Sequence, residues 1–222
     1  MISVVIPAFN EAGTLPATVR ALKALPEIGE IVIVDDGSTD GTAEVASALG
    51  CRVVRLDRNR GKGEALAAGV AAASGDVLVF LDADLGATSA QAKALVAPIL
   101  RGEADLVIGR MPEAAKPGGL GLVKALARAG VRRLGGIALA APLSGQRAVR
   151  RAVLTALPEF AYGFGVEVAM AIDAARAGFR VVEVPVAMGH RETGRDIAGF
   201  LHRGRQLVHV ARALIRRLRV LS

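Results

Sequence analysis

Five short apolar runs, separated by alanine-rich stretches, constrain the fold of this chain more than any other feature. The runs are rich in β-branched and aliphatic residues and occupy residues 3–7, 30–35, 52–56, 76–82 and 105–109. The stretches between them have the length that a helical crossover between parallel strands requires, near residues 12–25, 40–49, 62–74 and 88–101. Strands that are apolar on both faces belong inside a sheet covered by helices. We therefore expect an α/β fold with a mostly parallel central sheet flanked by helices, in which residues 1–110 form a doubly wound half.

The second half of the chain has a different texture. Residues 111–121 are rich in Pro and Gly and predict a loop. Further periodic segments predict helices near 122–134, 166–177 and 197–221 and a strand over 180–186. Because no repeat or linker interrupts the chain, we expect one domain over residues 1–222. Its parts would be a nucleotide-binding half (1–110), an acceptor half (111–196) and a C-terminal helix (197–222).

Most of the net positive charge lies at the carboxyl end of the chain. The 222 residues hold 28 Lys and Arg against 21 Asp and Glu, a formal net charge of +7. The segment 190–222 carries eight Arg and two acidic side chains, whereas the segment 1–189 carries the other 20 basic and 19 acidic side chains. A nearly neutral body with a basic tail disfavours a protein that coats nucleic acid over its whole surface.

Cysteine usage fits a reducing compartment, and hydropathy predicts no transmembrane helix. The single cysteine, Cys51, permits no internal disulfide and no thiolate metal cluster. The longest stretch without Asp, Glu, Lys or Arg covers residues 134–146, which is shorter than a membrane span. The strand-like run from Met1 to Ile6 lacks the features of a secretory signal. We expect a cytoplasmic protein.

Acidic and amide side chains follow three of the predicted strands. They belong to the segments Pro7–Glu11, Asp35–Asp40 and Asp82–Asp84. In an open α/β sheet, ligands bind at the carboxyl ends of the strands, so these segments predict one polar crevice. Known phosphate-binding fingerprints do not fit there. The segment Gly61–Leu66 lacks the last glycine of a dinucleotide motif, and Gly63 follows the Gly-Lys pair where a P-loop requires Ser or Thr.

The pair Asp82 and Asp84 predicts a metal site. In the turn after a buried strand, two carboxylates separated by one residue can converge on a hard cation. Oxygen ligands suit Mg²⁺ or Mn²⁺, and such an ion neutralises a diphosphate. The alternative is that Asp84 caps the next helix.

These segments together resemble the nucleotide-sugar-binding half of family-2-type glycosyltransferases, which have the Rossmann-like GT-A fold. The resemblance covers residues 2–110 through SVVIPAFNE, IVIVDDGSTDGT, NRGKGEAL and FLDADL. Ser144–Arg147 and Pro185–Gly194 resemble polyprenol- or dolichol-phosphate sugar transferases. Four other segments resemble glucosyl-3-phosphoglycerate synthases, namely Pro117–Gly119, Pro142–Gly145, Tyr162–Glu167 and His190–Arg191.

The resemblance implies a UDP-sugar donor and a set of residues that bind it. The donor-binding residues would be Pro7, Phe9, Asn10, Glu11, Asp36, Lys62, Asp82 and Ala83. Among these, Asp36 would accept a hydrogen bond from the uracil ring, and Asp82 would contact the ribose or the metal. Asp84 would bind the Mg²⁺ or Mn²⁺ that bridges the diphosphate, and His190 would complete that metal site.

Glu167 is the remaining candidate for a catalytic role, together with Asp84. The resemblance places Glu167 near the donor sugar, although a carboxylate at a helix start also complements the helix dipole. A hydroxyl acceptor needs a general base and a phosphate acceptor needs none. The sequence does not distinguish these acceptors, and it does not distinguish inversion from retention. It does not identify the transferred sugar either, although glucose is favoured.

Two departures from the related families concern the acceptor and the metal. Polyprenol-phosphate enzymes commonly carry Gln where this chain has Gly86. At positions where the synthases carry Arg, Thr and Asn, this chain has Gly121, Val123 and Glu192, which puts 3-phosphoglycerate in doubt as the acceptor. The predicted function is metal-dependent transfer of a sugar from a UDP-sugar. The alternatives are a polyprenol-phosphate transferase at the membrane and a nucleotide-sugar-binding protein without transfer activity.

The basic tail has more than one interpretation. Apolar residues recur with helical periodicity from Ile197 to Leu221, flanked by arginines. Such a helix can lie on an anionic membrane at the inner face, or pack on its own domain or across a homodimer. Nucleic acid is the least favoured partner, because Phe200 is the only aromatic residue of the tail.

Overall fold

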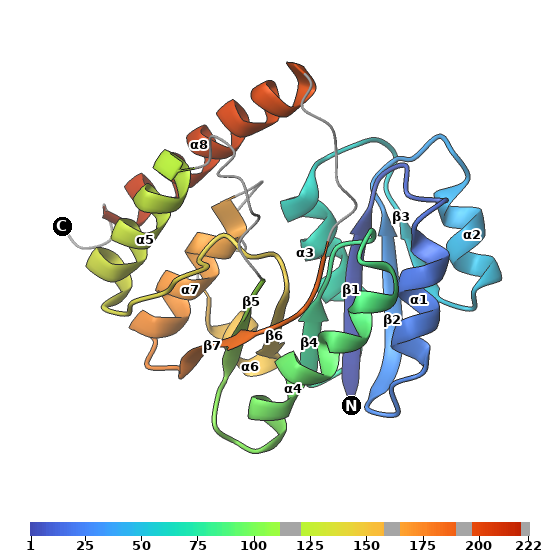
Figure 1. Cartoon of the computed structure of the whole chain (residues 1–222), viewed down its shortest axis with the longest axis horizontal. Helices are drawn as coiled ribbons and strands as arrows, with labels where there is room; N and C mark the ends of the chain where they lie inside the picture. Colours follow the sequence, from blue (N-terminus) through green and yellow to red (C-terminus); the bar gives the residue numbers. More distant parts are fainter. Residues whose placement is uncertain (112–120, 158–164, 190–196, 219–222) are drawn as a thin grey trace.

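The five apolar runs of the sequence all form strands of a seven-stranded sheet (Figure 1). The computed structural model describes residues 1–111, 121–157, 165–189 and 197–218. The strands lie in the order β3-β2-β1-β4-β6-β5-β7. They are β1 (Ile2–Ala8), β2 (Ile28–Asp35), β3 (Arg52–Arg55), β4 (Val77–Phe80), β5 (Leu106–Arg110), β6 (Arg147–Arg150) and β7 (Val181–Pro185). Only β6 runs antiparallel to its neighbours among these strands, so the expected mostly parallel sheet is confirmed.

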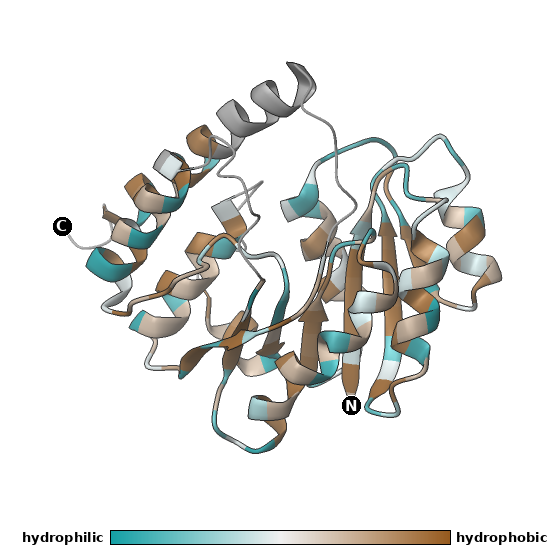
Figure 2. Cartoon of the chain, viewed as in Figure 1, coloured by the Kyte–Doolittle hydropathy of each residue, from teal (hydrophilic) through white to brown (hydrophobic). Residues whose placement is uncertain are grey.

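Helices cover both faces of the sheet. They are α1 (Leu15–Lys23), α2 (Thr42–Ala48), α3 (Lys62–Ala72), the 3₁₀ helix η1 (Gly86–Gln91), α4 (Ala92–Leu100), α5 (Gly121–Gly135), α6 (Arg151–Ala156), α7 (Val166–Arg176) and α8 (Ile197–Leu218). One core lies between the sheet and α1, α2 and α4, and includes Ile6, Ile33 and Val79. The other lies between the sheet and α3, α5 and α7, with α8 outside them. Strands β1 and β4 are almost wholly apolar, as Figure 2 shows.

The position of strand β6 shows that the predicted continuous doubly wound half is wrong in one respect. The sequence predicts β4 and β5 as members of one continuous half, but β6 lies between them and pairs antiparallel with both. Neither β6 nor the short helix α6 was predicted. The reason is that β6 is only four residues long and has an arginine at each end. Its strand conformation is fixed by two neighbouring strands rather than by a local apolar pattern.

The other expected elements are found close to their predicted positions. The helix expected over 88–101 begins as η1 and continues as α4, and the helix expected from 122 begins one residue earlier at Gly121. The predicted C-terminal helix is confirmed as α8 up to Leu218. The expected loop falls mostly on residues 112–120, which lie outside the described ranges.

None of the helices in the described part of the chain is long and apolar enough to span a membrane.

Candidate functional site

The loop after β1 is fastened to the loop after β2. The Asn10 N–H donates to Ser38 Oγ (2.9 Å), and the Thr39 N–H donates to Asn10 Oδ1 (3.0 Å). The Glu11 N–H donates to Thr42 Oγ1 (2.9 Å). Asn10 has φ of 57°, in the left-handed region that Asn adopts more readily than most residues. These contacts hold Asn10 and Glu11 at the carboxyl edge of the sheet, where the sequence placed them.

Pro7 and Phe9 flank the end of β1. Pro7 is half-buried within the strand, and the Phe9 ring directly after it is 45% exposed. An exposed aromatic ring at the carboxyl edge of the sheet offers a flat apolar surface on which a base can lie. The structure therefore leaves Phe9 accessible for the predicted nucleoside contact.

Asp36 holds the segment that precedes α3. Its carboxylate is buried and accepts hydrogen bonds from the Arg60 N–H (2.7 Å) and the Gly61 N–H (2.9 Å). A carboxylate that accepts backbone N–H groups forms strong, charge-assisted hydrogen bonds. In addition to the predicted contact with uracil, Asp36 thus positions the start of α3, and with it Lys62.

Lys62 joins the two halves of the chain through a cluster of charges. Its ammonium lies 2.8 Å from Asp82 Oδ1, after β4, and 3.5 Å from Glu167 Oε1, at the start of α7. Burial opposes the charge of Lys62, but the carboxylates of Asp82 and Glu167 raise its pKa above the ordinary value. Because the pKa of Lys62 is raised, its ion pairs with Asp82 and Glu167 stabilise the folded protein at neutral pH. This stabilisation is lost only as the pH rises through the raised pKa of Lys62. The predicted donor-binding residues Lys62 and Asp82 are therefore together with the catalytic candidate Glu167.

Gln146 completes this cluster and was not predicted. Its fully buried side-chain amide donates to Asp82 Oδ2 (2.5 Å), and its Oε1 accepts the Asp82 N–H at 3.2 Å. The Asp82 carboxylate is thereby held between Gln146 and Lys62. The sequence contains the segment Ser144–Arg147 but no local signal that it lies beside Asp82, because this contact depends on the antiparallel pairing of β6 with β4.

Arg147 fixes the turn that carries Gln146. Its buried guanidinium donates to three carbonyl oxygens, those of Ser144 (2.8 Å), Pro142 (2.7 Å) and Glu167 (2.6 Å). Burial lowers the pKa of Arg147 to about 10, so the group is still charged at neutral pH. Arg147 therefore links the turn to the start of α7 and holds Glu167 within reach of Lys62.

Asp84 lies in the turn between β4 and η1. Thr18, from α1, braces this turn, since its hydroxyl donates to the Ala83 carbonyl (2.8 Å) and accepts the Gly86 N–H (2.8 Å). Asp84 is half-buried, and Ala83 is buried between the two aspartates. Asp82 and Asp84 thus belong to one short segment that Thr18 braces.

These carboxylates fit a divalent cation. Mg²⁺ is usually bound by one or two carboxylates together with substrate phosphates, so a full protein cage is not required. Within the described ranges, no group of three His, Cys, Asp or Glu side chains is arranged to hold a metal ion. The predicted ligand His190 lies outside the described residues, and its role stays a prediction. Asp84, with Asp82 beside it, is the described part of the proposed metal site.

The close approach of Gly145 to this cluster leads to a testable prediction. A Cβ atom at Gly145 would overlap Lys62 Nζ and would lie in van der Waals contact with the Asp82 carboxylate. We expect Gly145→Ala to displace the ammonium end of the Lys62 side chain. UDP binding should then weaken about tenfold, because the charge-assisted contact of Lys62 with the nucleotide is lost. Isothermal titration calorimetry with UDP measures this change.

Gly13 provides the matched control for that substitution. It is exposed, and a Cβ atom there would meet nothing within 4 Å. Gly13→Ala should leave UDP affinity within about twofold of the wild type. Equal affinities of Gly145→Ala and wild type would show that Lys62 does not contribute to nucleotide binding.

Comparison with known proteins shows that this chain is similar to glycosyltransferases. The family model described as "Glycosyl transferase family 2" matches residues 3–125. Glucosyl-3-phosphoglycerate synthase from Mycobacterium tuberculosis is 37% identical over 196 residues, which cover 78% of this chain and 60% of that protein. An undecaprenyl-phosphate 4-deoxy-4-formamido-L-arabinose transferase from Pseudomonas paraeruginosa is 44% identical over 95 residues, 38% of this chain and 28% of that protein. The chain thus spans about 60% of the length of the synthase that it matches.

A solved structure agrees with the fold and the expected ligands. The crystal structure of the Mycobacterium tuberculosis synthase in complex with Mn²⁺, UDP-glucose and phosphoglyceric acid superposes with a TM-score of 0.79 at 33% sequence identity. The match covers 98% of this chain and 79% of that chain. The predicted GT-A fold is therefore confirmed over nearly the whole chain.

Proposed function

Because the chain belongs to glycosyl transferase family 2, we propose that it transfers glucose from UDP-glucose to a phosphorylated acceptor in a reaction that requires Mg²⁺ or Mn²⁺. The observation that carries the proposal is the cluster of Lys62, Asp82, Gln146 and Glu167, with Asp84 next to it, at the carboxyl edge of the sheet. This is the edge at which open α/β sheets bind their ligands.

Each part of the site has a distinct task in the proposed reaction. The segment Pro7–Glu11 and Asp36 bind the nucleoside, and Asp84 holds the divalent cation with Asp82 and His190. That cation neutralises the diphosphate as it leaves the sugar. The Glu167 side chain lies 3.5 Å from the Lys62 ammonium. Its carboxyl oxygens can accept a hydrogen bond from a hydroxyl group, either of the donor sugar or of an acceptor that must lose its proton.

The acceptor falls into one of two chemical classes, and both carry a phosphate. The synthase relative suggests a small phosphorylated acid, and the undecaprenyl-phosphate relative suggests a lipid phosphate at a membrane surface. Val123 stands at one of the three positions where this chain differs from the synthases. Its side chain is buried in the core and is not available to bind a ligand. This supports an acceptor other than 3-phosphoglycerate.

An acceptor screen tests the proposal. The protein is incubated with radiolabelled UDP-glucose and Mn²⁺ or Mg²⁺, together with glycerate phosphates, polyprenyl phosphates or free sugars. We expect labelled product with one phosphorylated class and loss of product with EDTA. Tight binding of UDP-glucose with neither transfer nor slow hydrolysis would instead identify a nucleotide-sugar-binding protein. Failure to bind UDP-glucose with either metal would refute the donor assignment.

A further inference from the structure

Helices α5 and α8 pack closely along one side of the molecule, where Figure 1 shows them at the upper left. Val210, Ala213 and Leu214 of α8 are buried on its inner side. A Cβ atom at Gly130 of α5 would overlap Leu214 Cδ2, so glycine permits this close packing. The inner side of α8 from Val210 to Leu214 is therefore occupied by its own domain, as one interpretation of the tail predicted.

The outer sides of the same two helices expose apolar side chains. Five of the eight large apolar side chains that are exposed among the described residues lie here, namely Leu126, Leu207, Val208, Ile215 and Leu218. Each is 38–50% exposed. Their spacing places Val208, Arg212 and Ile215 on one side of α8, because residues three and four apart are neighbours on a helix. We call the surface formed by these five apolar residues and Arg212 the α5–α8 face.

The charges on both helices have one sign. Lys124, Arg128, Arg132 and Arg133 of α5 are exposed, as are Arg212 and Arg216 of α8. Neither helix contains an Asp or Glu residue. Arg133 lies two helical turns beyond Leu126 on the same side of α5. The exposed apolar residues are thus surrounded by positive charge with no acidic residue on either helix.

We infer that the α5–α8 face binds the surface of an anionic lipid bilayer. A helix face that combines Lys and Arg with exposed aliphatic residues can insert its apolar side chains among the lipids while its cations contact acidic headgroups. A second copy of the chain would bring like charges together, which opposes symmetric pairing through this face. The described part of the face carries no aromatic side chain for stacking on bases, so nucleic acid fits less well.

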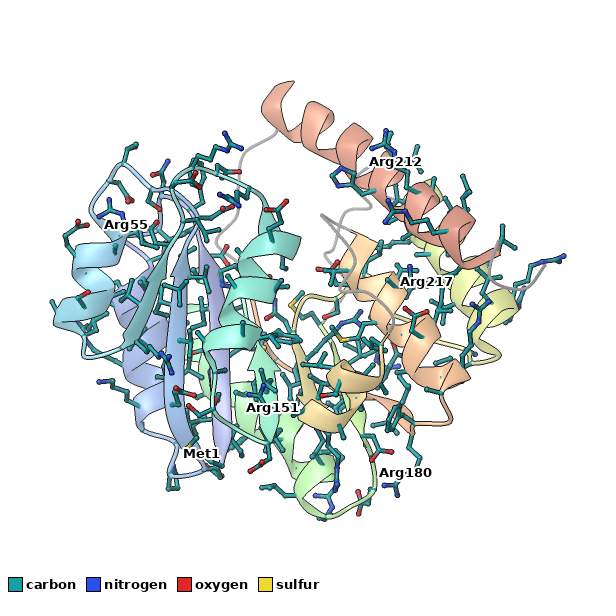
Figure 3. The ribbon with its side chains drawn as sticks, turned by 180° about the vertical axis from the view of Figure 1, so that it is seen from behind. Met1, Arg55, Arg151, Arg180, Arg212 and Arg217 are labelled. Atoms are coloured by element: carbon teal, nitrogen blue, oxygen red, sulfur yellow. The ribbon has the colours of Figure 1, made fainter. Side chains whose placement is uncertain are left out.

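The proposed membrane surface thus includes α5 as well as the C-terminal helix. The arginines of α8 fall into two groups. Arg212 is exposed on the outer side, whereas Arg217 is buried and paired with Asp173 of α7 (Figure 3). Binding to lipid does not depend on the proposed transfer activity, so the two are tested separately.

Vesicle co-sedimentation tests the inference. We expect the full chain to bind vesicles that mix phosphatidylcholine and phosphatidylglycerol in a two-to-one ratio, and to bind pure phosphatidylcholine at least about tenfold more weakly, since each basic residue contributes to the attraction. The Arg212→Glu/Arg216→Glu variant should bind anionic vesicles about thirtyfold more weakly than wild type. Ile215→Ser should weaken binding about tenfold, because it removes an apolar group that enters the bilayer. Binding should also fall as the salt concentration rises.

Arg20 and Lys93 supply a control with the same change in charge. Both are exposed, and they lie on α1 and α4, which cover the other face of the sheet. Arg20→Glu/Lys93→Glu should bind anionic vesicles within about threefold of wild type, and circular dichroism checks that each variant is folded. Equal binding to both kinds of vesicle, or equal loss in both double variants, overturns the inference. The inference is also overturned if the wild type does not bind vesicles and is a dimer that Ile215→Ser converts to a monomer. In that case the α5–α8 face binds a second copy of the chain.

Discussion

Replacement of Asp84 by asparagine is expected to lower the rate of sugar transfer by 10²–10³-fold, roughly 3–4 kcal/mol of transition-state stabilisation. Asp84 is proposed to hold the cation that neutralises the leaving diphosphate, and Asn keeps the shape of the side chain without its charge. The turn itself should survive, because Thr18 braces it through the Ala83 carbonyl and the Gly86 N–H. Initial rates with saturating UDP-glucose, once the acceptor is known, measure the effect; hydrolysis of UDP-glucose serves until then.

Binding measurements separate a metal ligand from a purely structural role of Asp84 in the turn before η1. If Asp84 binds the cation, the affinity of wild type for UDP should rise when Mn²⁺ is added, and that of Asp84→Asn should not. The N-cap residue of η1 is Leu85, so the alternative prediction that Asp84 caps this helix is wrong. If Asp84 only stabilises the turn before η1, the variant should lose stability while its UDP affinity still depends on Mn²⁺. Asp76→Asn is the matched control, because Asp76 is exposed at the amino end of the same strand. It should leave both the rate and the metal dependence unchanged.

The sequence predicts the donor half of the fold well, because local pattern and final position agree there. Strands β1, β2, β4 and β5 are apolar runs that are largely buried, and β3 is a half-buried edge strand. Asn10, Asp36 and Asp82 follow strands whose carboxyl ends meet at one edge. Strand β6 is different. Its four residues carry no local strand signal and become a strand only by pairing with β4 and β5.

The unpredicted part of the site has the same physical origin. Gln146 contacts Asp82 only because β6 lies beside β4, and Arg147 contacts the Glu167 carbonyl across twenty residues of chain. A single sequence gives no measure of such nonlocal contacts. The tail shows the same limit. The periodicity of α8 predicts the helix and its apolar stripe, but not that Arg217, rather than its neighbour Arg216, is buried.

Among the substitutions proposed here, removal of the Arg217 side chain is expected to lower the free energy of unfolding most. The guanidinium donates from Nε to Asp173 Oδ1 (2.8 Å), and a second bond joins Nη2 to Oδ2; both side chains are buried. Arg217→Met leaves the Asp173 carboxylate buried without this partner, which costs about 3–5 kcal/mol. For a chain of this size the melting temperature should fall by about 10 °C. Calorimetry measures the change, and Arg212→Met, at an exposed arginine of the same helix, should stay within about 0.5 kcal/mol of wild type.

A double variant distinguishes the ion pair from simple loss of packing. Asp173→Leu/Arg217→Met replaces both charges by apolar groups, so no buried charge is left alone, and it should recover most of the stability lost in Arg217→Met. A double variant no more stable than Arg217→Met would show that the guanidinium acts mainly through packing and its bond to the Ala213 carbonyl. Recovery would show that the Asp173–Arg217 pair specifies how α8 docks on α7. In that case Arg217→Met should also weaken binding to anionic vesicles, although Arg217 is buried, because the α5–α8 face requires a docked α8.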